Sequence, residues 1–188
     1  MCIRDRLKIK GHHNIWNAAV AAAIGRLFGV PVGVIREVLY TFSGLPHRLQ
    51  PVGKFNRPKR VEVYNDSKST TPNALKAALE AFNEKRVVLL FGGKDKGVSF
   101  KGLKKLFKER VKYAVAYGEN RFRLFEELSD AAPIELEETL EGAFKRALDR
   151  LEDGDILLLS PGSASFDLFS SYEERGERFI ELVREYFG

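Results

Sequence analysis

The sequence predicts an α/β protein in which helices cover both faces of a doubly wound, mostly parallel sheet. Strand-length apolar runs alternate with amphipathic helical patterns, in units of roughly 25 residues. The clearest of these runs are VVLLF at 87–91 and ILLL at 156–159. Such alternation is typical of parallel strands joined by helical crossovers, and we expect it to form one domain over residues 45–188.

The elements follow one another in a regular order along the chain. An Ala-rich helix at 12–28 and a shorter one at 31–40 come first, and the turn at 43–46 marks a boundary. The segments LQPVGKF and KRVEVYN then read as two strands around the basic turn NRPKR. The expected strands from there are 61–65, 87–91, 113–117, 133–136 and 156–160. The expected helices are 72–83, 100–110, 120–129, 137–151 and 171–187, the first of which begins at a proline.

Composition excludes several classes of protein. The 188 residues are 44% hydrophobic and 11% aromatic, which is enough for a real core and excludes a disordered chain. No apolar run approaches the length of a membrane span, and MCIRDRLKIK lacks the apolar region of a secretory signal. Cys2 is the only cysteine, which excludes an internal disulfide and fits a reducing cytosol. We therefore expect a cytoplasmic location.

The net charge of +5 comes largely from two basic clusters, at 54–60 and 101–112. A nucleic-acid partner must therefore be considered. The second cluster, however, includes Leu103, Leu106 and Phe107 at helical spacing, so its lysines fit the solvent-exposed face of a packed helix. We favour a solvated surface and expect no nucleic-acid partner.

Three strand-to-helix loops carry unusual chemistry. In doubly wound sheets, ligands bind at the carboxyl ends of the strands, where these loops lie. The first is NDSKSTTP at 65–72, with a carboxylate, an ammonium and four hydroxyls. The second is GGKDKG at 92–97, whose glycines expose N–H groups beside Lys94 and Lys96 and suggest an anion cradle. The third, at 161–176, brings the hydroxyls of Ser163 and Ser165 to the sheet edge.

Each loop also has a purely structural interpretation. Asp66, Ser67 or Thr70 could cap the helix that begins at 72, and for any one of them alone capping is the simpler explanation. Neither a dinucleotide fingerprint nor a G-K-[ST] phosphate loop occurs in the sequence, and no nucleophile-elbow pattern surrounds the serines. Because several cations and hydroxyls gather at one edge, we favour a site for a small ligand with more than one carboxylate.

The three loops, in this order and spacing, resemble the C-terminal domain of the Mur ligases. Upstream, GHHNIWNAAVAAA resembles the family's G-x-H-N-x-x-N-A helix and GLPHR its His-Arg turn. The resemblance runs from residue 7 to the end of the chain. The NDSK form is similar to the branch that adds D-glutamate, since sister ligases carry different residues between the Asp and the Pro.

The resemblance implies an ATP-dependent amide ligation in peptidoglycan precursor synthesis. In this reaction ATP phosphorylates a substrate carboxylate, and an incoming amine attacks the acyl phosphate. The implied substrates are ATP, D-glutamate and UDP-N-acetylmuramoyl-L-alanine, and the implied metal is Mg²⁺, with ligands expected outside these residues. The resemblance also leads us to expect a monomer.

The family's binding residues can be placed at matching positions in this sequence. Asn14 and Asn17, one helical turn apart, would face the adenine of ATP, although a helix N-cap is an equal alternative for Asn14. Arg48 would reach the nucleotide phosphates and Asp66 the ribose hydroxyls, while His47 fits a structural role better than a catalytic one. The residues expected to hold D-glutamate are Lys68, Thr70, Lys96 and Ser165, with the backbone near Phe166 and Tyr172.

The resemblance also divides the chain. Residues 1–44 correspond to the end of the family's central, ATP-binding domain, and residues 45–188 to the amino-acid-binding domain, with 1–6 matching nothing in the family. The family's phosphate loop, magnesium ligands and carbamylated lysine do not occur here, so we expect no turnover from this chain alone. Two alternatives stay open: a folylpolyglutamate-synthase-like ligase, and a non-catalytic module for acidic amino acids or nucleotides.

Overall fold

The computed structural model describes residues 7–9, 11–84 and 86–188 of the chain. Its contacts divide the protein into two compact units, Met1–Leu45 and Pro46–Gly188. The expectation that residues 1–6 are foreign to the family falls outside the described residues. The assignment of the first unit to an ATP-binding domain stays a prediction.

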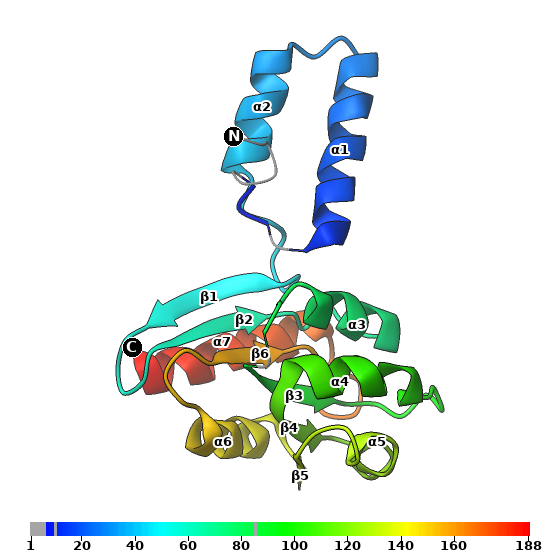
Figure 1. Ribbon diagram of the computed structural model, residues 1–188, viewed down its shortest axis with the longest axis vertical. Helices are drawn as coiled ribbons and strands as arrows, with labels where there is room; N and C mark the ends of the chain where they lie inside the picture. Colours follow the sequence, from blue (N-terminus) through cyan, green and yellow to red (C-terminus); the bar gives the residue numbers. More distant parts are fainter. Residues whose placement is uncertain (1–6, 10, 85) are drawn as a thin grey trace. The chain divides into compact units, whose positions relative to one another are not determined.

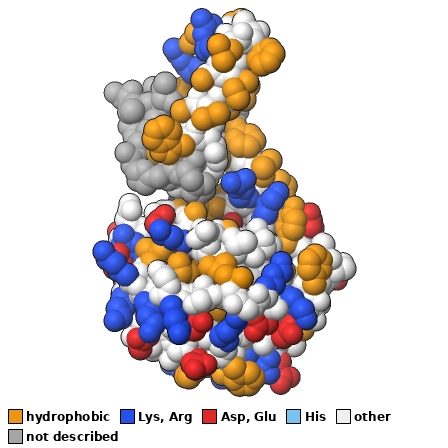
Figure 2. Space-filling model, turned by 90° about the vertical axis from the view of Figure 1, so that its right-hand side faces the viewer, with side chains coloured by type: hydrophobic (Ala, Val, Ile, Leu, Met, Phe, Trp, Pro, Cys, Tyr) orange, Lys and Arg blue, Asp and Glu red, His pale blue; other side chains and the backbone are white. Residues whose placement is uncertain are grey.

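The first unit is a pair of helices, α1 (His12–Leu27) and α2 (Val32–Thr41) (Figure 1). Gly11 is the N-cap of α1 and Asn14 lies inside the helix, so the alternative of an Asn14 cap is wrong. Large apolar side chains are exposed on this unit, and they gather as orange patches in Figure 2. The most exposed are Trp16, Leu27 and Phe28, at 73%, 86% and 82%.

The second unit is built on a six-stranded sheet in the order β1-β2-β6-β3-β4-β5 (Figure 1). The strands are β1 (Gln50–Phe55), β2 (Val61–Asn65), β3 (Val87–Gly92), β4 (Val111–Tyr117), β5 (Ile134–Glu137) and β6 (Ile156–Leu159). Only β1 pairs antiparallel, with β2; every other pairing of the sheet is parallel. The expected mostly parallel sheet is therefore confirmed.

Helices cover both faces of this sheet. They are α3 (Pro72–Glu80), α4 (Lys104–Arg110), α5 (Arg121–Leu128), α6 (Leu140–Arg150) and α7 (Tyr172–Phe187). The buried side chains of α3, α4 and α5 pack in one core, and those of α6 and α7 in the other. Central strand β3 serves both cores, because Leu89 and Phe91 belong to the first and Val88 and Leu90 to the second. This alternation follows from the two-residue period of a strand.

Local sequence signals set the helix boundaries. Thr71 caps α3 by accepting from the Ala74 N–H at 3.3 Å, directly before the expected start at Pro72. Thr139 and Ser171 cap α6 and α7 in the same way. The expected helix at 100–110 begins instead as a 3₁₀ turn, η2 (Lys101–Leu103). Its apolar residues Leu103 and Phe107 are buried, as its helical spacing indicated.

The topology brings the three unusual loops to one edge. Strands β2, β6 and β3 are neighbours and parallel, so their carboxyl ends lie side by side. The loops that leave these ends are the NDSK turn (residues 65–71), the GGK loop (92–99) and the PGS loop (160–171). Across the described parts of the chain, no helix combines the length and the apolar character needed to cross a bilayer.

A glycine at the end of β3 gives a first test of this packing. Gly92 has φ +122°, and a Cβ built on it would lie 2.1 Å from the Tyr117 carbonyl oxygen. We expect Gly92→Ala to lower the free energy of unfolding by about 2–4 kcal/mol, because both the backbone conformation and the neighbouring strand oppose a methyl group. Thermal and urea denaturation would measure the loss.

Gly102→Ala is the matched control, since nothing lies within 4 Å of its added Cβ and its φ is not positive. We expect this change to leave stability within about 1 kcal/mol of wild type, or to raise it. Equal effects of the two substitutions would contradict the close approach of β3 to β4 at Gly92.

Candidate functional site

The NDSK turn is held by the carboxylate of Asp66, which is 6% exposed. Its Oδ1 accepts from the Leu49 N–H at 2.9 Å, and its Oδ2 accepts from the Ser160 hydroxyl at 2.8 Å. Asp66 therefore joins the turn after β2 to the turn before β1 and to the end of β6. The cap of α3 is Thr71, so the capping interpretation is wrong for Asp66, Ser67 and Thr70.

Burial governs the ionisation of Asp66. It raises the pKa of this carboxyl to about 6, although the hydrogen bonds from Ser160 and Leu49 and the positive charges of Arg48 and Arg175 all lower it. Each oxygen has further acceptor capacity, so the predicted contact with ribose hydroxyls stays a prediction.

The turn that carries Arg48 has an unusual backbone. His47 and Leu49, on either side of it, have positive φ of 59° and 45°, a region that non-glycine residues rarely adopt. Hydrogen bonds hold this conformation: the His47 N–H donates to Gln50 Oε1 at 2.9 Å, and its carbonyl accepts from the Lys68 N–H at 2.9 Å. Arg48 itself is exposed, so its guanidinium is available to a ligand.

The ring of His47 is buried between β2 and α7. Asn65 Nδ2 lies 3.0 Å from His47 Nδ1, and His47 Nε2 lies 3.3 Å from Glu177 Oε1. The amide of Asn65 is oriented independently, because its Oδ1 accepts from the Ser67 N–H and its Nδ2 donates to the Gly176 carbonyl. His47 Nδ1 must therefore accept, which places the ring proton on Nε2, facing Glu177. His47 is a structural residue, as the sequence favoured.

Helix α7 approaches this ring closely. A Cβ built on Gly176 would lie 2.1 Å from His47 Nδ1. Only glycine allows the helix and the imidazole to pack at this distance. The residue before it, Arg175, is the largest fully buried side chain of the described residues, at 0% exposure.

The guanidinium of Arg175 joins the NDSK turn to the PGS loop. Its Nε donates to Ser67 Oγ at 2.9 Å and its Nη2 to the Ser67 carbonyl at 2.8 Å. Its Nη1 donates to the Ser163 carbonyl at 3.0 Å. Burial lowers the pKa of Arg175, but an arginine side chain keeps its proton in a protein, so a full positive charge lies beneath the loops.

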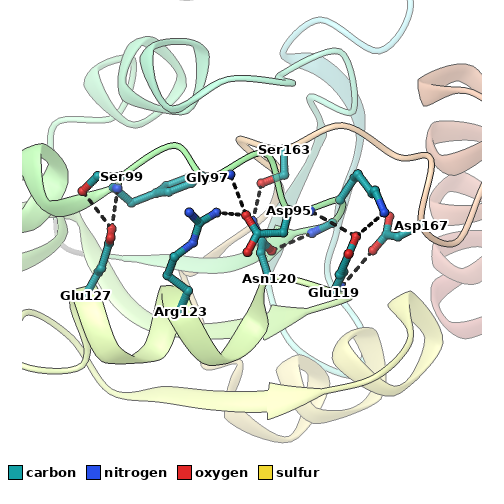
Figure 3. Close-up of polar contacts among 12 residues, drawn as sticks. Asp95, Gly97, Ser99, Glu119, Asn120, Arg123, Glu127, Ser163 and Asp167 are labelled. Atoms are coloured by element: carbon teal, nitrogen blue, oxygen red, sulfur yellow. Dashed lines mark hydrogen bonds and ion pairs between the residues drawn. The ribbon is translucent and has the colours of Figure 1, made fainter.

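The GGK loop is fastened by polar contacts from the end of β4 (Figure 3). Asn120 Oδ1 accepts from the Gly93 N–H at 3.1 Å, and its Nδ2 donates to Ser163 Oγ at 2.9 Å. Arg123 pairs with Asp95, and the Glu119 N–H donates to Asp167 Oδ2 at 3.0 Å. Loops after β3, β4 and β6 therefore form one connected network.

The two lysines of the GGK loop have different environments. Lys94 Nζ lies 2.8 Å from Glu119 Oε2, a pairing that raises the pKa of Lys94 and lowers that of Glu119. Lys94 is therefore paired with a carboxylate in this structure, and the anion cradle of Lys94 and Lys96 stays a prediction. Lys96 is exposed, and the described residues include no ion-pair partner for it.

The other residues expected to bind the amino acid lie on the NDSK turn and the PGS loop. Lys68 is exposed, with Nζ 5.4 Å from the centre of the Tyr172 ring, and Thr70 is half-buried. Ser165 is 1% exposed, and no partner for its hydroxyl is found among the residues described. Phe166, by contrast, is 68% exposed. A buried hydroxyl without a partner is costly, and the contact of Ser165 with an amino acid stays a prediction.

The two asparagines of α1 belong to the first unit and are described within it. Asn17 Nδ2 donates to Asn14 Oδ1 at 3.3 Å, so the two side chains share one face of the helix as their spacing predicts. Their contact with adenine stays a prediction. No group of three His, Cys, Asp or Glu side chains in the described ranges is arranged to hold a metal ion.

Sequence reasoning missed Arg175, Asn120 and the structural role of Asn65. Arg175 could have been found, because it shares the spacing of the buried residues Phe179 and Val183 on α7 and so falls on the apolar face of that helix. Asn120 carried no comparable signal, since its partners Gly93 and Ser163 are distant in sequence.

The fold and these loops define the second unit as a Rossmann-like domain that presents cations and hydroxyls at the carboxyl edge of its sheet. Residues 47–162 match the family model described as Mur ligase, glutamate ligase domain. This chain belongs to the Mur ligase family, which confirms the resemblance found in the sequence.

Two relatives show the extent of the similarity. UDP-N-acetylmuramoylalanine--D-glutamate ligase from Aquifex aeolicus is 46% identical over 181 residues, covering 96% of this chain and 43% of the relative. The protein of the same name from Salinibacter ruber is 41% identical, with 96% of this chain and 38% of the relative covered. The chain thus spans less than half the length of these relatives.

Solved structures share the fold at lower identity. The UDP-N-acetylmuramate-alanine ligase MurC of Thermotoga maritima has a TM-score of 0.68 and 20% identity, over 95% of this chain and 39% of its own. Folylpolyglutamate synthase of Mycobacterium tuberculosis, complexed with ADP, has a TM-score of 0.66 and 18% identity, over 94% of this chain and 41% of its own. At these identities the likeness concerns the fold alone.

The raised pKa of Asp66 predicts how its contribution to the free energy of unfolding depends on pH. Because the pKa is higher in the folded than in the unfolded protein, the folded form binds more protons between about pH 4 and pH 6. The contribution of Asp66 to the free energy of unfolding should therefore fall as pH rises through this window. Asp66→Asn preserves the geometry without titrating, since an amide can accept from the Leu49 N–H and donate to Ser160.

We expect the stability of Asp66→Asn relative to wild type to increase by about 2 kcal/mol between pH 4 and pH 7. Urea denaturation across this range gives the measurement, and Asp149→Asn, at an exposed position on α6, controls for the loss of a negative charge. A difference between Asp66→Asn and wild type that does not change with pH would contradict the raised pKa.

Proposed function

We propose that this chain is the C-terminal part of an ATP-dependent ligase that adds D-glutamate to UDP-N-acetylmuramoyl-L-alanine during peptidoglycan precursor synthesis. The observation that carries the proposal is the 46% identity over 96% of the chain to a relative named for this substrate pair. The geometry agrees with it, since Lys68, Lys96 and the unpartnered hydroxyl of Ser165 lie on three loops at one sheet edge.

The amino-acid site would work by holding both carboxylates of D-glutamate. In this proposal Lys68, Thr70 and Lys96 bind carboxylate oxygens, and Ser165 donates its hydroxyl from below, with the backbone near Phe166 and Tyr172 completing the site. Two fixed carboxylates orient the molecule and leave its amine free to reach the acyl phosphate. In this proposal Glu119 fixes the position of the GGK loop, because it pairs with Lys94 and accepts from the Asp95 N–H.

On the second unit, the NDSK turn and the turn before β1 would also contact ATP. Exposed Arg48 is suited to phosphate oxygens, and Asp66 has lone pairs left for ribose hydroxyls. Asn14 and Asn17 would recognise adenine. Magnesium would assist the phosphates when bound, with ligands outside the described residues, so none of its chemistry is assigned to side chains of this chain.

The first unit is proposed to be the end of an ATP-binding domain. Its exposed Trp16, Leu27 and Phe28 support this, since soluble proteins rarely leave such a patch uncovered. The complete protein is proposed to be a cytoplasmic monomer. This chain alone should not turn over ATP, because the sequence contains no G-K-[ST] loop to hold the phosphates.

A folylpolyglutamate-synthase-like activity is the second candidate, because that fold is also a structural neighbour. The NDSK turn and the names of the relatives at 37–46% identity favour the D-glutamate ligase. A non-catalytic module for acidic amino acids would keep the same binding site, and only the complete protein could distinguish it from a ligase.

Binding of D-glutamate to this chain tests the proposed site. We expect a saturable interaction in an NMR titration of the ¹⁵N-labelled protein, with the amide signals of the NDSK turn and PGS loop responding. Lys96→Ala should weaken it about tenfold or more, because a charge-assisted hydrogen bond to a carboxylate is lost. L-glutamate, titrated in parallel, reports the stereochemical preference.

Lys105→Ala is the matched control, since it removes one exposed lysine from α4, away from the loops. Binding by this variant should equal that of wild type. If Lys96→Ala and Lys105→Ala bound D-glutamate equally well, Lys96 would have no role in the site, and an unresponsive wild-type protein would refute the site itself.

A further inference from the structure

We propose that Arg175 is a positioning residue that sets the distance between the two carboxylate-binding loops, and so selects the length of the dicarboxylic amino acid. This inference rests on the proposed function, because it presumes that the NDSK turn and the PGS loop bind the substrate's carboxylates. Arg175 itself is buried and would not contact the substrate.

The contacts of Arg175 are divided between the two loops. Two of its nitrogens hold Ser67, the residue before Lys68, and a third holds the Ser163 carbonyl, two residues before Ser165. One planar guanidinium therefore fixes the separation of two backbone segments that carry predicted ligand groups. Its five donors have a fixed geometry, so the separation cannot change without breaking a hydrogen bond.

The third loop is linked to the same point. The Lys94 N–H donates to the Ala164 carbonyl at 2.9 Å, so the position of the GGK loop is tied to that of the PGS loop. A Cβ built on Gly93 would lie 3.2 Å from Arg175 Nη1, which shows how close this backbone passes to the guanidinium. Arg175 thus lies at the junction of all three loops, one of which carries Lys96.

The buried charge argues for a specific role. No carboxylate of the described residues lies within ion-pair distance of Arg175, and its three acceptors are a hydroxyl and two carbonyls. An apolar side chain would fill this place at lower cost in desolvation, since a buried charge is expensive even when it is hydrogen-bonded. What the guanidinium adds is directional hydrogen bonding to two loops at once.

The test compares D-glutamate with D-aspartate, which is shorter by one methylene group. Wild type should prefer D-glutamate by about tenfold or more, the usual effect of one methylene in a fitted site. In Arg175→Lys the single ammonium cannot reach both loops. We expect D-glutamate binding to weaken about tenfold and the preference over D-aspartate to fall to within about threefold, because the loop separation is no longer fixed.

A purely structural role would lower the fraction of folded molecules and leave the ratio of the two affinities unchanged. The ratio, measured by NMR titration of the folded protein, is therefore the deciding readout. Arg178→Met, one turn further along α7, removes a half-exposed arginine paired with Glu141 and should keep the wild-type ratio. Retention of that ratio in Arg175→Lys would overturn the proposal.

Ser67→Ala keeps the test decisive if Arg175→Lys does not fold. It removes the hydroxyl that accepts from Arg175 Nε and donates to the Tyr172 carbonyl at 2.7 Å, and it keeps the Ser67 carbonyl that accepts from Arg175 Nη2. We expect a reduced preference for D-glutamate, between the values of wild type and the arginine variant, and an unchanged ratio would count against the inference. A wild-type chain that binds neither amino acid would refute the proposed function and this inference together, whereas normal wild-type binding with unchanged variants refutes only the inference.

Discussion

The carboxyl edge of this sheet depends on one buried guanidinium. Arg175 is fully buried, so each of its three nitrogens must find a protein acceptor, and the acceptors come from the segments that follow β2 and β6. This requirement draws the NDSK turn and the PGS loop onto the first turn of α7. The positive charge below them also favours ionised Asp66, against the burial that opposes it.

A second constraint comes from the strand order. Strand β6, the last in sequence, is inserted between β2 and β3, so three loops from distant parts of the chain end side by side. Hydrogen bonds then join them: the Ser160 hydroxyl donates to Asp66 Oδ2, and Asn120 accepts from the Gly93 N–H and donates to Ser163 Oγ. Loops held in this way can present Lys68 and Lys96 on the surface while their own backbone stays fixed, which is what recognition of a small, doubly charged molecule requires.

Much of this architecture could be predicted from the sequence. Apolar runs and helical periodicity located every strand and helix of the second unit, and the three loops were identified from their composition alone. The sequence could not show that Thr71, rather than Thr70 or Asp66, caps α3, because all are good capping residues within one turn. It also could not distinguish Lys94 from Lys96, since the neutralising Glu119 arrives from another strand. Contacts that depend on tertiary proximity leave no local pattern.

The close approach of α7 to His47 has an evolutionary consequence. Gly176 supports the site by lacking a side chain, and its neighbour Arg175 supports it by reaching far into the protein. Any missense change in the glycine codon introduces a Cβ against the imidazole, so either the ring or the helix that carries the guanidinium must shift. Substitutions at Gly176 and at Arg175 should therefore damage the same contacts, and we expect these two residues to change more slowly in evolution than the exposed positions of α7.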